Sequence, residues 1–275
     1  MSEQVLVVIG VGGMGEAVAR RLGAGRTVVL GDVSEQTLRR VAASLGDDGF
    51  QVITQQVDVT ARDSVRQFVD AAAKAGRITQ VVHTAGLSPV QASTEKVLRV
   101  DLYGVAAILE EFGAAVAPGG AGVIIASMAA HLSGGLSPEQ ERALMKTPAE
   151  ELLRLPFLQP SHVSDSGHAY AIAKRANVLR VLEASVAWGR RRARINSISP
   201  GIISTAMGQE ELKGPDGQKM RAMLSVSPMG RLGSSSDIAA AAAFLLGPDA
   251  SFVTGTDLLV DGGVVAALKT GRLEG

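Results

Sequence analysis

Short runs of Val and Ile alternate along the chain with longer segments in which apolar residues recur at helical spacing. The runs predict strands at residues 5–9, 27–30, 51–57, 80–84, 123–127, 194–198 and 257–260. The longer segments predict helices at residues 13–23, 34–45, 62–75, 94–116, 169–188 and 236–246. The strands lack an in/out alternation, which is typical of a parallel sheet covered by helices on both faces. The pattern therefore predicts one doubly wound α/β domain over residues 1–275.

Two segments interrupt this rhythm, residues 131–167 and residues 201–229. The first contains four prolines and two short helical patterns, at 138–145 and 148–155, and the second is rich in Gly, Met and Ser. Each follows the carboxyl end of a predicted strand, which is where open α/β sheets bind ligands. We expect a lid-like insertion at 131–167 and a substrate loop at 201–229.

The composition narrows the classes of function. Lys and Arg number 27, as do Asp and Glu, so the net charge of zero argues against nucleic acid or an anionic membrane as the main partner. The chain has no cysteine, and its four histidines do not fall at metal-ligand spacing, so we expect no metal site. The N-terminus carries Glu3 and no basic segment, which indicates a strand rather than a signal peptide and a cytoplasmic protein.

A glycine-rich turn follows the first predicted strand and opens the first helix. It reads Gly10-Val11-Gly12-Gly13-Met14-Gly15, a pattern that allows the backbone to approach a pyrophosphate. Asp32 stands at the end of the second strand, where a carboxylate accepts hydrogen bonds from an adenosine ribose and repels a 2′-phosphate. No Lys or Arg lies in the turn or directly after Asp32, so the sequence predicts NAD(H) rather than NADP(H).

Tyr170 and Lys174 are four residues apart near the start of a predicted helix, so their side chains share one helical face. A free phenol titrates near ~10, and a neighbouring positive charge favours its ionised form. This pair is thus a candidate general acid/base.

With these features in place, the chain resembles the short-chain dehydrogenases/reductases from Val5 to Gly263. Thr84-Ala85-Gly86 resembles the family's Asn-Asn-Ala-Gly turn, Asn196-Ser197-Ile198-Ser199-Pro200-Gly201 its Pro-Gly turn, and Val260-Asp261-Gly262-Gly263 a C-terminal signature. The resemblance implies a Rossmann sheet of seven mainly parallel strands in the order 3-2-1-4-5-6-7. It implies cofactor contacts from Gly10, Gly12, Gly13, Met14, Gly15, Asp32, Asp58, Val59, Ala85, Gly86, Tyr170, Lys174, Pro200, Gly201, Ile203 and Thr205.

The same resemblance implies the roles of four catalytic residues. Tyr170 would exchange a proton with the substrate oxygen, Lys174 would lower the pKa of Tyr170 and hold the nicotinamide ribose, and Ser127 would hydrogen-bond the substrate oxygen. Asp101 stands where the family has the asparagine of its proton relay, and a carboxylate cannot donate unless it is protonated. The glycine turn is also one residue shorter than the family's.

The implied activity is hydride transfer between NAD(H) and a secondary alcohol or ketone. An epimerase or dehydratase using the same Tyr/Lys pair, and a non-catalytic NAD(H)-sensing protein, are the alternatives. Ser127 and Tyr170 are 43 residues apart, a spacing similar to that of hydroxysteroid dehydrogenase/carbonyl reductase members with an insertion. Family members commonly pair through helices matching residues 94–116 and 169–188, which implies a homo-oligomer, a dimer or tetramer; a monomer and a dimer rebuilt by the insertion are the alternatives.

The substrate is not specified by these motifs. Nine apolar residues of the two unusual segments are candidates for an apolar pocket or, equally, for packing of these segments on the domain. They are Leu132, Leu136, Leu144, Met145, Leu152, Phe157, Met207, Met220 and Met223.

Overall fold

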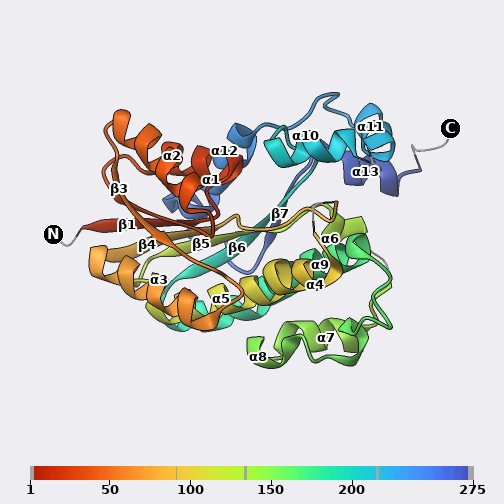
Figure 1. Ribbon diagram of the computed structural model, residues 1–275, viewed down its shortest axis with the longest axis horizontal. Helices are drawn as coiled ribbons and strands as arrows, with labels where there is room; N and C mark the ends of the chain where they lie inside the picture. Colours follow the sequence, from red (N-terminus) through yellow and green to blue (C-terminus); the bar gives the residue numbers. More distant parts are fainter. Residues whose placement is uncertain (1–2, 91, 133–134, 215–216, 272–275) are drawn as a thin grey trace.

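Seven parallel strands form one sheet in the order β3-β2-β1-β4-β5-β6-β7 (Figure 1). This order and the doubly wound architecture are as predicted, with every strand pair parallel. The computed structural model describes residues 3–90, 92–132, 135–214 and 217–271. The strands are β1 (Gln4–Ile9), β2 (Thr27–Asp32), β3 (Gln51–Gln56), β4 (Arg77–His83), β5 (Ala121–Ile125), β6 (Arg194–Pro200) and β7 (Asp257–Val260).

Helices cover both faces of the sheet, as Figure 1 shows. One layer contains α1 (Gly13–Leu22), α2 (Glu35–Asp47) and α12 (Ser235–Leu246), and the other contains α3 (Arg62–Ala75), α5 (Val105–Ala115) and α9 (Ser166–Arg190). Along β1, Leu6 and Val8 pack with the first layer and Val5 and Val7 with the second. Because both faces are buried, the strand is apolar throughout, which explains the uninterrupted Val/Ile runs of the sequence.

The helix predicted at 94–116 is three elements in the structure. A short α4 (Thr94–Val97) leads into a π-helix, η1 (Leu98–Gly104), and then into α5. The wide turn contains Asp101, which is fully buried. π-Helical turns occur mostly as short interruptions within α-helices, and they are frequent at functional sites.

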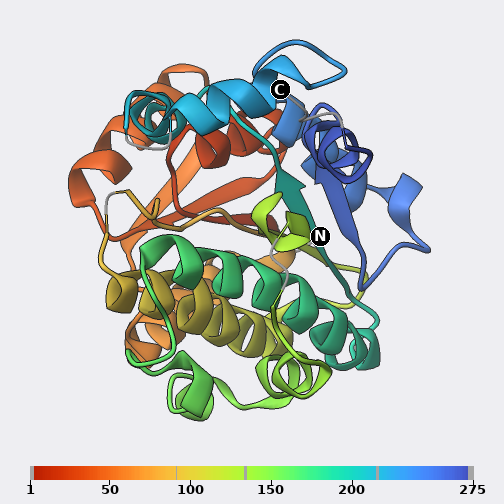
Figure 2. The same ribbon diagram turned by 90° about the vertical axis from the view of Figure 1, so that its right-hand side faces the viewer.

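The segment at 131–167, for which we predict a lid-like role, forms short helices that pack on the domain. It begins within α6 (Ala129–Leu132) and contains α7 (Pro138–Lys146), α8 (Ala149–Leu152) and η2 (Pro156–Leu158). Figures 1 and 2 place α7 and α8 on the outer side of α9, away from the carboxyl edge of the sheet. Arg180 of α9 donates to the carbonyls of Leu144 and Thr147 at 3.0 and 2.8 Å, and Arg175 donates to Glu141 at 2.7 Å. These contacts fasten the insertion to the domain.

The physical reason lies in the apolar residues of the insertion. Leu144 and Leu152 are fully buried in the core cluster that contains α5 and α9, and Leu136, Met145 and Phe157 pack against it. Five of the nine candidate pocket residues are therefore packing residues. Burial of these side chains stabilises the insertion where it lies, so covering the substrate would require breaking that core.

The segment at 201–229 forms two further helices, α10 (Ala206–Lys213) and α11 (Gly217–Ser225), which the sequence did not predict. Figure 2 looks onto the carboxyl edge of the sheet and shows α10 and α11 on the opposite side of this edge from α9. A last helix, α13 (Val264–Lys269), follows β7 and contacts α11.

We predict that Leu144→Ala lowers the free energy of unfolding by about 2–5 kcal/mol, because it leaves a cavity at a site that is 0% exposed. Urea unfolding measures the change. Ile53→Ala, on edge strand β3, removes a side chain that is 40% exposed and should lower stability much less. Equal losses for the two variants would contradict the docking of α7 on α9.

Candidate active site

The glycine turn after β1 is shaped by close approaches of the backbone. Gly10 has φ +84°, and a Cβ there would lie 2.3 Å from the amide nitrogen of Ala85. A Cβ on Gly15 would lie 2.0 Å from the carbonyl oxygen of Gly10, so this glycine allows α1 to pack closely on the turn. Nothing lies within 4 Å of the corresponding point on Gly12, which leaves space in front of the start of α1.

Asp32 is the last residue of β2, and its carboxylate is held by two backbone amides. One oxygen accepts from the amide of Val11, and the other from the amide of Ser34, both at 2.9 Å. The first bond joins the end of β2 to the glycine turn. The carboxylate is thus fixed in place beside the space that the glycines leave open.

That space is a cavity of about 380 Å³ at the carboxyl ends of β1, β2 and β4. Of the predicted cofactor residues it is lined by Gly10, Gly12, Gly13, Met14, Asp32, Asp58, Val59, Ala85, Gly86 and Thr205. Val33, Val100 and Ala206 also line it and were not predicted. Gly15 lines neither this cavity nor its neighbour, in accord with a packing role. The open glycine backbone beside a fixed carboxylate fits the phosphates and ribose of a dinucleotide.

A second, larger cavity of about 870 Å³ continues from the first, since both share Met14, Thr84, Gly86, Leu87, Thr205 and Met207. Of the predicted residues it is lined by Met14, Gly86, Asp101, Ser127, Tyr170, Lys174, Pro200, Gly201, Ile203 and Thr205. The predicted catalytic residues are therefore brought together from η1, α9 and the turn after β5. Together the two cavities give room for an extended cofactor and a substrate.

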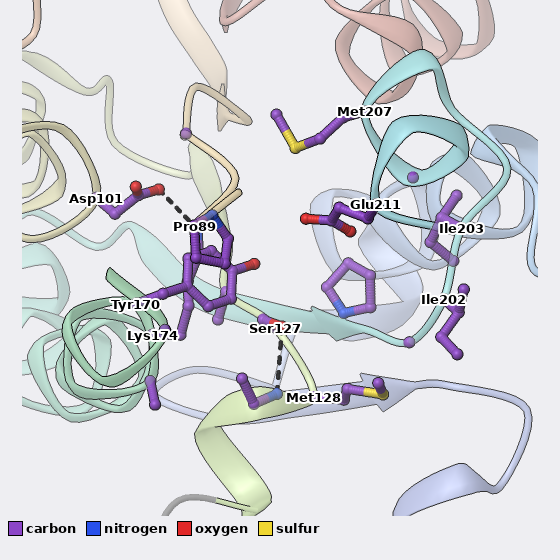
Figure 3. A pocket seen from close by; sticks show the side chains of 18 of the residues that line it. Pro89, Asp101, Ser127, Met128, Tyr170, Lys174, Ile202, Ile203, Met207 and Glu211 are labelled. Atoms are coloured by element: carbon purple, nitrogen blue, oxygen red, sulfur yellow. Dashed lines mark hydrogen bonds and ion pairs between the residues drawn. The ribbon is translucent and has the colours of Figure 1, made fainter. Parts of the chain in front are cut away.

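Three groups meet at the inner wall of the larger cavity (Figure 3). The Nζ atom of Lys174 lies 5.3 Å from the centre of the Tyr170 ring and 3.5 Å from the carbonyl oxygen of Ile125. Ser127 lies two residues beyond β5, and its hydroxyl accepts from the amide of Ala129 at 3.2 Å and hydrogen-bonds Tyr170. The phenol of Tyr170, the hydroxyl of Ser127 and the ammonium of Lys174 thus converge on the larger cavity.

Burial raises the pKa of the Tyr170 phenol, while the charge of Lys174 and the hydrogen bond with Ser127 act in the opposite direction. Lys174 acts to lower the pKa of Tyr170, as expected, but desolvation of the hydroxyl outweighs this effect and the pKa is raised. Burial also works against the charge of Lys174, yet Asp101 and Tyr170 outweigh it and leave its pKa raised. The lysine is therefore charged beside a protonated phenol.

Asp101 forms an ion pair with Lys174, with Oδ1 and Nζ 3.2 Å apart and both side chains buried. The Asp101 carboxylate also accepts from the amide of Leu87, at 3.1 and 3.2 Å. Gly86 makes room for it, because a Cβ on this glycine would lie 2.6 Å from Oδ1. At the position of the family's relay asparagine, this chain thus places the counter-ion of Lys174.

His83, at the end of β4, is fully buried near this pair. Burial, together with the charge of Lys174, lowers the pKa of His83 to about 3. The imidazole is neutral at physiological pH, so it adds no charge to the site.

The outer part of the larger cavity is lined mostly by apolar side chains. Four of the nine apolar candidates line it, namely Leu132, Met207, Met220 and Met223. The ends of the insertion contribute Asp165, Ser166 and Gly167. Glu211 of α10 also lines the cavity, and sequence analysis missed it. Glu211 follows Met207 by one helical turn, a spacing that would have placed both side chains on one face if the helix had been predicted.

Two kinds of feature are not found in the part of the chain that the structure describes. No group of three or more His, Asp or Glu side chains there could hold a metal ion. No helix among those residues is long and apolar enough to cross a membrane.

Comparison with protein families agrees with this geometry. Residues 3–137 match the family model described as short chain dehydrogenase, and residues 135–265 match the one described as enoyl-(acyl carrier protein) reductase. The chain is 43% identical over 270 residues to the short-chain dehydrogenase/reductase bsc3 of Alternaria brassicicola, with 98% of each chain covered. It therefore belongs to the short-chain dehydrogenase/reductase family.

Two further similar proteins are named hydroxysteroid dehydrogenases. The 3-alpha-hydroxysteroid dehydrogenase/carbonyl reductase of Comamonas testosteroni is 31% identical over 214 residues, with 76% of this chain and 82% of the relative covered. The crystal structure of the 3-alpha-hydroxysteroid dehydrogenase from Pseudomonas sp. B-0831 complexed with NADH has a TM-score of 0.79 at 27% identity, with 97% and 99% of the two chains covered. The protein is thus an oxidoreductase of a family that uses nicotinamide cofactors.

Proposed function

We propose that this chain is an NAD(H)-dependent alcohol dehydrogenase or carbonyl reductase that transfers a hydride at a secondary alcohol or ketone, with Tyr170 as the acid/base. The convergence of Ser127, Tyr170 and Lys174 on one cavity supports this assignment most directly. The nicotinamide cofactor, when bound, supplies or accepts the hydride.

In this proposal each side chain acts on the substrate oxygen. The Ser127 hydroxyl holds that oxygen, and the Tyr170 hydroxyl gives it a proton during ketone reduction or takes one during alcohol oxidation. Lys174 stabilises the phenolate that remains after the proton has left, and Asp101 keeps Lys174 charged and in place. Pro200 and Gly201, at the end of β6, line the same cavity.

The choice of NAD(H) over NADP(H) is also part of the proposal. It is supported by the fixed carboxylate of Asp32 and by Val33, which follows it where a basic residue would favour a 2′-phosphate. The residues named above from Gly10 to Thr205 would hold the cofactor along the two joined cavities.

Two other functions remain alternatives of different kinds. An epimerase or dehydratase would use the same Tyr170 and Lys174, but the relatives described above are named dehydrogenases and reductases. A non-catalytic NAD(H)-sensing protein would not need acid/base residues. In this chain Ser127, Tyr170 and Lys174 all line the larger cavity.

We also propose a homo-oligomer, formed through only part of the surface expected, the end of α9, together with the segment before β7. The outer side of α9 is occupied along part of its length by α7, which limits pairing through the long helices. Leu182 and Val186, near the end of α9, are 50% and 61% exposed, and Phe252 before β7 is fully exposed. Gly255 lies against Leu182 and Ser185, so this segment adjoins α9. These three apolar side chains define a patch, the α9–β7 patch, that suits a second copy of the chain.

Replacing Tyr170 with Phe tests the acid/base assignment, since the ring is kept and the hydroxyl is lost. We expect turnover to fall by at least ~10²-fold while NADH still binds. Initial rates of NADH oxidation with a panel of cyclic ketones, and a fluorescence titration of NADH, measure the two effects. Because burial raises the pKa of Tyr170, wild-type alcohol oxidation should rise with pH as the phenolate forms. Rates within a few-fold of wild type for Tyr170→Phe would contradict the assignment.

For the cofactor, wild-type kcat/KM should favour NADH over NADPH, and Asp32→Ala should reduce this preference by about tenfold or more, because a charge-assisted hydrogen bond is lost. Asp47→Ala, an exposed carboxylate at the end of α2, is the matched control and should leave the preference unchanged. Equal wild-type use of NADH and NADPH would overturn this part of the proposal.

Sedimentation velocity tests the proposed oligomer. The wild type should sediment as a multiple of 28.4 kDa at micromolar concentration, and Leu182→Asp combined with Phe252→Asp should shift it toward the monomer. Ile53→Asp, on the opposite edge of the sheet, should remain an oligomer. A wild-type protein that sediments only at 28.4 kDa would refute the proposed assembly.

A further inference from the structure

Glu211 is a carboxylate that the proposed hydride transfer does not use. It lies on α10, one helical turn after Met207, and both residues line the larger cavity. Figure 3 shows its carboxylate directed toward the space in front of the Tyr170 hydroxyl, from the opposite wall. A substrate whose oxygen reaches Tyr170 would therefore extend toward Glu211.

The position of this carboxylate is fixed by one hydrogen bond. Its Oε1 accepts from the hydroxyl of Ser88, which is fully buried in the loop after β4. Within the described ranges, no hydrogen bond to Oε2 and no ion pair with Glu211 occur. The carboxylate is thus anchored through one oxygen, while the other can accept from a bound molecule.

Among the described residues, no cation lies within ion-pair distance of Glu211, and Lys174 acts on it only through space. Lys174 is paired with Asp101, and Asp165 accepts from the amide of His168 at the start of α9. Lys219 lines the cavity from α11 but is exposed and lies beyond ion-pair distance of Glu211 among the described contacts. A substrate that entered would displace water from the carboxylate, and an apolar group would leave that charge unsatisfied.

We infer that Glu211 determines substrate choice by accepting a hydrogen bond from a second donor group on the substrate, a hydroxyl or an ammonium, distant from the reacting oxygen. The preferred substrate is then a ketone or secondary alcohol that carries such a donor. This inference rests on the proposed function, because it assumes that the reacting oxygen lies at Tyr170 and Ser127.

A purely electrostatic role for Glu211 would have a different signature. Its negative charge disfavours the phenolate of Tyr170, an effect that would alter the rate for every substrate by the same factor. Recognition of a donor, in contrast, affects only those substrates that carry the donor. A series of ligands that differ in one remote group separates the two roles.

Calorimetric titration of the full chain, with and without NADH, with cyclohexanol, cyclohexane-1,4-diol and 4-aminocyclohexanol tests the inference. Alcohols with NADH form complexes that cannot react, so binding is measured apart from turnover. We expect the diol and the amino alcohol to bind the wild type about tenfold or more tightly than cyclohexanol. If neither binds more tightly than cyclohexanol, the inference is wrong.

Three variants identify the group responsible. Glu211→Ala should bind all three alcohols within about twofold of one another, since the acceptor is gone. Glu211→Gln, which keeps an oxygen acceptor without the charge, should retain the preference for the diol and lose that for the ammonium. Glu210→Gln, an exposed neighbour on α10, is the control and should behave as wild type.

The outcomes separate this inference from the proposed function. If Glu211→Ala changes the affinity for all three alcohols by the same factor, Glu211 acts through the electrostatics of Tyr170 and donor recognition is overturned. Donor-dependent binding that is lost in Glu211→Ala supports the inference even if the corresponding ketones do not oxidise NADH. That lack of turnover would instead count against the assigned dehydrogenase activity.

Discussion

The parallel direction of all seven strands is the constraint on which the rest of this structure depends. It places the carboxyl end of every strand at the same edge of the sheet, so each turn that leaves a strand there faces the same space. The glycine turn after β1, Asp32 at the end of β2 and Ser127 beyond β5 are far apart in the sequence and meet for this reason alone. Helices on both faces bury the sheet and leave this edge as the place where ligands can enter.

At that edge the chemistry is set by a balance between burial and charge. Burial keeps the Tyr170 phenol protonated, and Lys174 offsets only part of that effect. The lysine can remain charged in the interior because the π-helix η1 presents Asp101 to it at 3.2 Å. Removing one partner of such a buried ion pair strongly destabilises a protein, so Asp101 belongs to the core as well as to the acid/base group that we propose.

Much of this arrangement could be predicted from the sequence, because it depends on local patterns. Apolar runs located all seven strands, and the spacing of Tyr170 and Lys174 placed both on one helical face. The failures depend on contacts between distant residues. The π-helix within residues 94–116 and the helices α10 and α11 have no local signature of comparable strength. The packing of the insertion could not be read from the sequence either: both its ends reach the cavity, whereas its Leu144 and Leu152 pack near α5 and α9.

Asp32, which we propose selects NAD(H), illustrates how a side chain with two roles can become difficult to exchange. Its two carboxylate oxygens accept from the amides of Val11 and Ser34, so the same side chain joins the glycine turn to β2 and defines the start of α2. A lineage that changed its cofactor would have to supply other acceptors for those amides before it could lose the carboxylate. The order in which substitutions accumulate would then matter, and such epistasis would hold the cofactor preference constant while the substrate side of the cavity diversified.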